Sequence, residues 1–363
     1  MNVFMLIFIY LPVVIITAIT PYITRKTESF GVTIPSDMYE DPRFRNFRSS
    51  YAKRSILLGV VFVLVLGILE RLVDENVWIL IFTVSVFAYL IATFIIYYQF
   101  HKKMKEIKEA EKWFEKKKKA ITVDMNFRRK KITYSNAWFL IPFAIAITTL
   151  IFTLLHQDDF PDRLPMHYNF QGEVTDWADK SLGILLMFPL LQLFFVGLFL
   201  FINYTIVRSK QLVDPANPEE SVMQNMIFRR RWSLFNIVTG TLLVIMFGLT
   251  QLSFVYDINP QTLFVLTMVL TGIILIGSII LTYMTGQGGS RVKIGRKING
   301  EVIQRDDDQY WKLGIFYYNT EDPALWVEKR FGSGWTMNIA RPTAWLILLG
   351  ILIIPFIIYL LAR

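Results

Sequence analysis

The chain has 363 residues, of which 54% are hydrophobic, 15% aromatic and only 18% charged, and its mean hydropathy is +0.43. Soluble domains are about 45–50% apolar and about 25% charged, so this composition largely excludes a soluble globular enzyme. The lack of cysteine excludes disulfides, thiolate zinc sites and a cysteine nucleophile. A formal net charge of +9 favours either nucleic acid or anionic lipid as a partner, and the positions of the charges decide between them.

Eight apolar stretches are long enough to cross a bilayer, which takes about 18 residues. They cover residues 2–23, 55–73, 77–98, 137–155, 182–207, 234–256, 261–285 and 343–362. Glu70 and Arg71 shorten the second stretch. The first lacks the basic start of a signal peptide, and we interpret it as a retained anchor. The sequence therefore predicts an all-α polytopic membrane protein with about eight transmembrane helices.

Basic residues are concentrated in alternate loops. The loops 24–54, 99–136, 208–233 and 286–342 hold 34 of the 38 Lys and Arg residues. The positive-inside rule makes these loops cytoplasmic and places both termini outside. The net charge is then about +15 on the cytoplasmic side and −6 on the outer side. The basic loops are expected to attract anionic lipid headgroups, and no nucleic-acid partner is expected.

The spans and loops divide the chain into five regions. Residues 1–136 form an N-terminal three-span region, 137–207 a two-span unit with the external loop 156–181, 208–285 two further spans, 286–342 a cytoplasmic aromatic-rich segment, and 343–363 the last span.

Three local patterns in the cytoplasmic loops predict structure. Asn217-Pro218-Glu219-Glu220 has the capping residue, proline and acidic first turn of a helix start. Residues 43–54 are compatible with a basic helix lying at the headgroups. Alternating residues around Phe331-Gly332-Ser333-Gly334 predict a small β-hairpin before the last span.

The spans contain almost no ionisable residues, since only Glu70 and Arg71 lie near the end of one of them. Intramembrane charges mark proton relays and ion pathways, so an ion-coupled transporter is disfavoured. The main polar residues within the spans are amides, which we expect to form interhelical hydrogen bonds. They are Gln192, Asn203, Asn236 and Gln251.

The external loop 156–181 is acidic and aromatic, and Pro165 and Gly172 restrict its backbone. It holds two of the three histidines, so His156, His167 and an aspartate are one candidate metal set. The His-Glu-x-x-His spacing of zinc hydrolases and the Gly-x-Ser-x-Gly elbow are absent. We assign no catalytic residue, no metal ligand and no cofactor.

A second catalytic interpretation of the loop pairs its carboxylates as acid and base. The residues concerned are Glu173, Asp176 and Asp179. Spacing along a loop does not fix the distance between them, so this alternative stays open.

The run Leu164-Pro165-Met166-His167-Tyr168-Asn169 is followed by Gly172-Glu173, Asp176-Trp177 and Lys180-Ser181. This pattern resembles the signature of DUF1648, a bacterial membrane domain that is best known from the SdpI-like immunity proteins. The resemblance covers residues 135–205. Residues 310–338 are similar to a second small domain, DUF5808, and residues 30–54 resemble the loop that such relatives carry.

The resemblance implies a multi-pass protein of the bacterial plasma membrane with a ligand-binding external loop. The ligand-binding residues that it implies are Pro165, His167, Tyr168, Asn169, Gly172, Glu173, Asp176, Trp177 and Lys180. The SdpI-like proteins give immunity to a peptide toxin and are associated with signalling through a cytoplasmic regulator. They are shorter, whereas here three extra spans precede the signature and a cytoplasmic hairpin follows it.

We therefore expect the chain to sense, or to give immunity to, an external antimicrobial or toxin peptide, with a cytoplasmic regulator as a further partner. The first alternative is a small-molecule or lipid transporter. The second is a membrane-embedded hydrolase that uses His167. The loop residues are also compatible with a purely structural role, in which they bond to one another and join the fourth span to the fifth.

Overall fold

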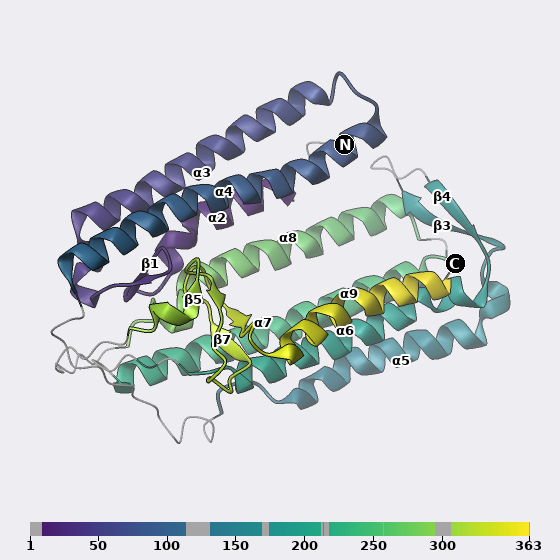
Figure 1. Cartoon of the computed structure of the whole chain (residues 1–363). Helices are drawn as coiled ribbons and strands as arrows, with labels where there is room; N and C mark the ends of the chain where they lie inside the picture. The colour runs from purple at the N-terminus through teal and green to yellow at the C-terminus, as the bar shows by residue number, and fades with distance from the viewer. Residues whose placement is uncertain are drawn as a thin grey trace. The chain divides into compact units, whose positions relative to one another are not determined.

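The computed structural model describes residues 9–113, 131–168, 174–211, 213, 218–256, 258–294 and 306–362. Helices dominate these ranges (Figure 1). They are α2 (Leu11–Ile23), α3 (Pro42–Leu69), α4 (Glu75–Glu111), α5 (Leu140–Leu155), α6 (Leu182–Arg208), α7 (Pro218–Leu252), α8 (Pro260–Thr285) and α9 (Pro342–Ala362).

Seven of the described helices, α3 to α9, are long and apolar enough to cross a membrane. The chain is thus a multi-pass helical membrane protein, as its composition predicts. The predicted first span is described only over α2, whose 13 residues fall short of a bilayer's thickness. Its first residues, 1–8, lie outside the described part, so an eighth span stays a prediction.

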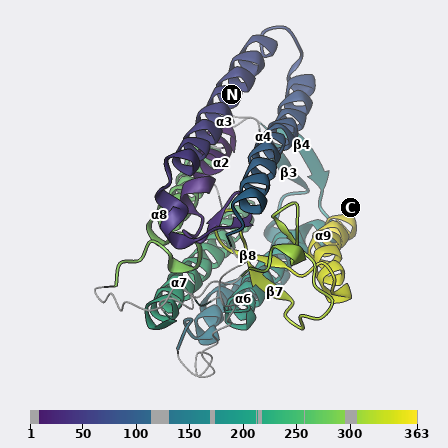
Figure 2. The ribbon, with the colours of Figure 1, turned by 60° about the vertical axis from the view of Figure 1, so that its left-hand side comes forward.

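All strands in the described residues belong to two-stranded antiparallel hairpins. Figure 2 shows two of them, β7 and β8, in the segment between α8 and α9. The pairs are β1 (Glu28–Ser29) with β2 (Val32–Thr33), β3 (Arg163–Tyr168) with β4 (Val174–Asp179), β5 (Trp311–Lys312) with β6 (Phe316–Tyr317), and β7 (Trp326–Glu328) with β8 (Trp335–Met337). The predicted hairpin before the last helix is confirmed by β7 and β8.

Helix ends follow the sequence signals with one exception. Helix α7 begins at Pro218, as predicted, and α3 ends at Leu69, directly before the charged pair Glu70-Arg71. The exception is the segment 43–54, which is not a separate helix. It forms the first turns of α3, because Asp41 caps the helix, Pro42 occupies its first position and no breaker follows before the apolar run.

The chain folds into two compact units, which we describe one by one. The first contains residues 1–127, 209–228 and 279–340, and the second contains 128–208, 229–278 and 341–363. Helices α7 and α8 contribute to both.

In the second unit the span amides form the predicted interhelical hydrogen bonds. The Gln192 amide of α6 donates to the Val244 carbonyl of α7 at 2.7 Å. Gln251 of α7 donates to the Leu185 carbonyl and the Thr153 hydroxyl, each at 3.0 Å. Buried amides therefore hold α5, α6 and α7 together where the hydrophobic effect between helices is absent.

The remaining two span amides act in the same unit. Asn203 donates to the Asn136 side chain at 2.7 Å and accepts from the Ser233 hydroxyl at 2.6 Å. Asn236 donates to the Phe199 carbonyl at 2.8 Å.

In the first unit, α2, α3 and α4 run side by side and an aromatic cluster fills the space where the β1–β2 turn meets α3 and α4 (Figure 1). Phe30 is 1% exposed and stacks on Phe100 and Phe331, with ring centroids 5.1 and 5.7 Å apart. Tyr97 donates its hydroxyl to the carbonyls of Phe30 and Leu313. Segment 306–340 is thereby packed onto the turn between β1 and β2.

A buried ion cluster joins the same parts. Arg330 is 2% exposed and forms ion pairs with Asp307 and Asp308, and Lys108 of α4 pairs with Asp308 at 2.6 Å. Burial favours the neutral form of Asp308, but Arg330 and Lys108 outweigh it and lower the pKa of Asp308 to about 2. Asp308 also accepts from the backbone and hydroxyl of Thr33. The three consecutive aspartates 306–308 lack the ligand spacing of a calcium-binding loop, and here they form ion pairs.

A substitution at Gly31 tests the packing of the β1–β2 turn against α4 and segment 306–340. Its φ of +74° and an ideal Cβ only 2.4 Å from both the Gly314 carbonyl oxygen and the Tyr97 hydroxyl exclude any larger residue. We expect Gly31→Ala to lower the free energy of unfolding by about 2–4 kcal/mol, through backbone strain and overpacking. Thermal unfolding of the detergent-purified protein measures the loss.

The matched control is Gly67→Ala in α3, where an added Cβ has no neighbour within 4 Å. This variant should be neutral or slightly more stable. Equal stability of the two variants would contradict the packing described for Gly31.

Glu28 gives the first unit a pH-dependent stability. Burial raises the pKa of Glu28 to about 7, against the attraction of Arg330 and Arg25, from an ordinary value of 4.5. Between these two pH values the unfolded chain loses its proton before the folded one, so the free energy of unfolding falls as pH rises, by about 3 kcal/mol in total. Glu28→Gln should abolish this decline when unfolding is followed across the same pH range.

The control for this prediction is Glu106→Gln, which changes an exposed carboxylate of α4. That variant should retain the decline. A decline of the same size in Glu28→Gln would show that another group causes it.

Candidate functional site

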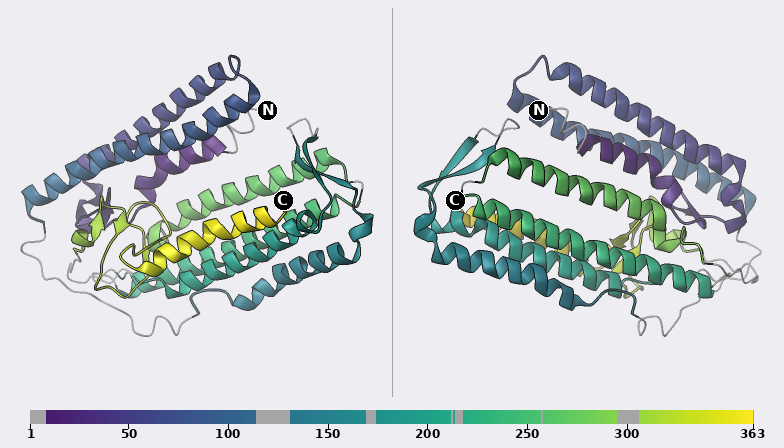
Figure 3. Two further views of the ribbon diagram at one scale, coloured as in Figure 1. Left: turned by 45° about the vertical axis from the view of Figure 1, so that its right-hand side comes forward. Right: turned by 180° about the vertical axis from the view of Figure 1, so that it is seen from behind.

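The predicted external loop contains a β-hairpin between α5 and α6 (Figure 3). Its register places Pro165 opposite Trp177 and His167 opposite Asp176, with irregularities on either side of His167. Residues directly opposite each other in an antiparallel pair are neighbours across the two strands. The fold therefore brings together four of the predicted site residues, which are up to twelve positions apart along the chain.

The structure describes the predicted site residues unevenly. Pro165, Asp176, Trp177 and Lys180 are described in full, and His167 and Tyr168 only by their place in β3. Asn169, Gly172 and Glu173 lie outside the described residues, so their predicted role remains a prediction.

One face of the hairpin is buried against the helices. Leu164 is fully buried and packs with Phe160, Ile184 and Leu185. Ala178, which pairs with Leu164 in the register, packs against the same cluster. Burying a leucine of this kind contributes about 1.5–3 kcal/mol, so the base of the hairpin is held firmly on the ends of α5 and α6.

The other face is exposed. Successive residues of a strand point to opposite faces, so this face carries Thr175, Trp177 and Asp179, all of them exposed, with Trp177 at 46%. Asp176 lies on the same side as Ala178 but further along β4, and it is exposed as well. Arg163 and Asp179 form an exposed ion pair, with Nε and Oδ1 3.6 Å apart, and the Arg163 guanidinium lies 5.9 Å from the Trp177 ring centroid. An exposed indole next to carboxylates is suited to bind a ligand that has both an apolar and a basic part.

Lys180 closes the hairpin. Its backbone N–H donates to the Asp162 carbonyl at 2.7 Å, and its ammonium donates to the Phe160 carbonyl at 2.8 Å. Both bonds fix Lys180, which follows β4 two positions before α6, to the segment that precedes β3. Lys180 thus stabilises the base of the hairpin and does not belong to its exposed face.

The metal alternative gains no support from the described residues, and the pairing of carboxylates stays a prediction because Glu173 lies outside them. His156 directs its Nδ1 to the Phe152 carbonyl at 3.0 Å and stacks on the Phe152 ring. Among the described residues no group of three His, Asp or Glu side chains is placed to hold a metal ion.

The two strands within 156–181 were not predicted. A signal was present for β3, where Leu164, Met166 and Tyr168 alternate with other residues, whereas β4 has no such alternation. The sequence analysis also missed a polar pocket in the first unit, whose lining residues come from four separate segments.

The buried face of the hairpin should contribute more to the stability of the protein than the exposed face, and substitutions can test this. We expect Leu164→Ala to lower the free energy of unfolding by about 2–5 kcal/mol because it leaves a cavity in the cluster under the hairpin. Trp177→Ala, on the exposed face, should change it by less than about 1 kcal/mol. Thermal unfolding of both variants measures the difference, and an equal loss would mean that the Trp177 side of the hairpin is also packed.

Two segments of the chain match known families. Residues 144–193 match the domain of unknown function DUF1648, and residues 320–345 match the family of unknown function DUF5808. No curated protein and no solved structure matches the chain. Both suspected domains are thus confirmed, while the closer likeness to SdpI-like immunity proteins stays a prediction. The chain is a multi-pass membrane protein in which α5, the β3–β4 hairpin and the start of α6 are similar to DUF1648, and the segment around β7 and β8 is similar to DUF5808.

Proposed function

We propose that this membrane protein recognises an external cationic, amphipathic peptide through the β3–β4 hairpin, and that recognition gives immunity or is signalled to a cytoplasmic regulator. The observation that carries the proposal is the division of the hairpin into a buried face and an exposed one. Leu164 is buried at its base, whereas Asp176 and Trp177 are exposed on the strand opposite. A rigid hairpin with an exposed acidic and aromatic face is preorganised to bind.

Charge favours a basic ligand. Residues 156–181 contain six Asp and Glu residues and only two basic residues, Arg163 and Lys180. Lys180 is engaged by the Phe160 carbonyl, and Arg163 pairs with Asp179. A net negative loop on a net negative outer side speeds the encounter with a cationic peptide.

The hairpin also offers a backbone edge. Within the described residues β3 and β4 form a sheet of two strands, so each strand has one edge without a partner strand. Strand β3 contains Pro165, which lacks an N–H group, whereas every residue of β4 has one. We propose that an extended peptide adds alongside β4, where main-chain hydrogen bonds give affinity and Trp177 and Asp176 give selectivity.

A cytoplasmic partner has a candidate surface as well. The β5–β6 hairpin exposes Leu313, Phe316 and Tyr318, each 43–45% exposed. Apolar side chains that cluster in this way on a folded segment are typical of a protein interaction site.

The test uses a strain from which the gene has been deleted. Cells that express the parent protein are compared with cells that express a variant, and survival is measured against a panel of cationic antimicrobial peptides. We expect the double variant Asp176→Asn, Trp177→Ala to lose protection, and the purified protein to bind the protective peptide at least about tenfold more weakly, since an exposed indole and a charge contribute about 1–2 kcal/mol together.

The control double variant is Glu70→Gln, Trp138→Ala, which removes another exposed outer carboxylate and another exposed tryptophan. It should protect like the parent at equal expression. A cysteine at the exposed Thr175 of β4 should react with an impermeant thiol reagent on intact cells. Full protection by the hairpin variant, or labelling of Thr175→Cys only after lysis, would overturn the proposal.

A further inference from the structure

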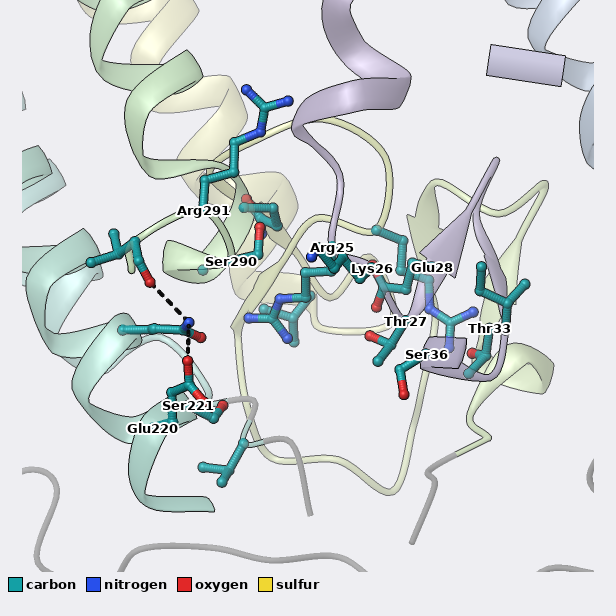
Figure 4. Close-up of a pocket in the computed structure, with 18 of the residues that line it drawn as sticks. Arg25, Lys26, Thr27, Glu28, Thr33, Ser36, Glu220, Ser221, Ser290 and Arg291 are labelled. Atoms are coloured by element: carbon teal, nitrogen blue, oxygen red, sulfur yellow. Dashed lines mark hydrogen bonds between the residues drawn. The ribbon is translucent and has the colours of Figure 1, made fainter. Parts of the chain in front are cut away.

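The first unit contains a polar pocket that is separate from the hairpin. Its volume is about 1020 Å³. Four segments line it. Figure 4 labels residues from three of them: the stretch after α2 with Arg25 to Glu28, the first turns of α7, and the glycine-rich turn after α8 with Ser290 and Arg291. Lys210 and Val213, before α7, and segment 307–330 complete the lining.

Three buried polar atoms of the lining lack a hydrogen-bond partner among the described residues. They are the indole Nε1 of Trp311, the hydroxyl of Ser290 and the carboxylate Oε2 of Glu28. Trp311 is 7% exposed and Glu28 is 8% exposed. Buried polar groups are nearly always hydrogen-bonded, because leaving one without a partner costs its full desolvation penalty. The indole requires an acceptor, the carboxylate requires a donor, and the hydroxyl serves as either.

The cations of the lining fall into two groups. Arg25, Arg330 and Lys210 are each paired with a carboxylate of the same unit. Arg291 instead donates to two neutral carbonyls, those of Tyr22 and Tyr283. No ion pair involves Arg291, Lys26 or the exposed Lys293 in the ranges that the structure describes. These three positive charges are thus left for an anionic ligand.

Arg291 is also held in place. Its guanidinium lies 4.4 Å from the Tyr283 ring centroid, in addition to its two carbonyl acceptors. A planar guanidinium fixed in this way loses little entropy when it binds an anion, and the combination of arginine and lysine is typical of phosphate recognition.

We propose that this pocket binds a phosphate ester that carries a hydroxyl or amine donor next to the phosphate. Lys26 and Arg291 contact the phosphate, Trp311 donates to one of its oxygens, and Glu28 accepts from the hydroxyl or amine. A phospholipid headgroup and a soluble organophosphate share this chemistry. The position of Tyr283 and Met284, at the end of the α8 span, gives a headgroup a route into the pocket.

Two arms of one experiment separate the two sources. In the first, full-length protein in phosphatidylcholine nanodiscs is titrated with glycerol 3-phosphate, with glycerol as the probe that lacks phosphate. In the second, the protein is reconstituted with phosphatidylglycerol or with phosphatidylcholine alone, and retained lipid is measured by native mass spectrometry. Phosphatidylcholine has a phosphate but no donor, so it should not be retained. Binding of glycerol 3-phosphate or of phosphatidylglycerol supports the proposal and identifies the source.

Variants then locate the site. Lys26→Gln, Ser290→Ala and Trp311→Phe each remove one group and preserve most of its shape. The Lys26→Gln variant should weaken binding about tenfold, as expected when one charge-assisted hydrogen bond is lost. The Lys102→Gln control, on the exposed side of α4, should leave affinity unchanged. Unfolding temperatures without ligand identify any variant that is simply unfolded, and such a variant is replaced by one of the other two.

The result that overturns the proposal is equally specific. Failure of both glycerol 3-phosphate and phosphatidylglycerol to bind would do so, as would equal retention of phosphatidylcholine. Equal affinity of the folded Lys26→Gln and Trp311→Phe variants and the parent would place the binding elsewhere. None of these outcomes bears on the hairpin, whose peptide binding is measured separately.

Discussion

The guanidinium of Arg330 is the centre on which the first unit depends. It is almost completely buried, and a buried charge without compensation costs several kcal/mol. Burial alone would lower the pKa of Arg330, but Asp307 and Asp308 more than offset it and keep the group charged. Because Asp308 also binds Thr33 and Lys108, the β1–β2 turn, helix α4 and segment 306–330 are joined through one charge cluster. Removing Asp308 would take one of two described carboxylate partners from Arg330 and one of two from Lys108.

The second unit uses a different principle. Within the spans there is no water to drive apolar surfaces together, and the helices are held by buried amides and hydroxyls instead. Gln251, for instance, contacts both α5 and α6 from α7. At the end of the same helices, the β3–β4 hairpin is held by hydrophobic packing. Leu164 of β3 and Phe160, which precedes the hairpin, are buried in this cluster. The exposed face of the hairpin is therefore supported by a rigid base.

Local signals in the sequence were sufficient for much of this fold. Apolar length predicted the spans, Pro218 the start of α7, Glu70 the end of α3, and the Gly332–Gly334 turn the β7–β8 hairpin. Each signal acts over a few residues, where propensity and capping decide the structure. The pairing of Asp308 with Lys108, 200 positions earlier, carries no such signal. The same reason explains why the pocket was missed, since Lys26, Ser290 and Trp311 become neighbours only in the folded unit.

Cations of the first unit that have a carboxylate partner can be distinguished from those that have none, and this distinction indicates which of them serve the fold and which are available to a ligand. Arg25, Arg330 and Lys210 each have a carboxylate partner, and so their burial is explained by the fold alone. The same explanation fails for Arg291, whose partners are neutral carbonyls, and for the indole of Trp311, which has no acceptor among the described residues. Since the other three cations of this lining have carboxylate partners, the fold alone does not explain why these groups lack such partners in the same pocket. A ligand that brings its own negative charge and its own acceptor supplies that explanation.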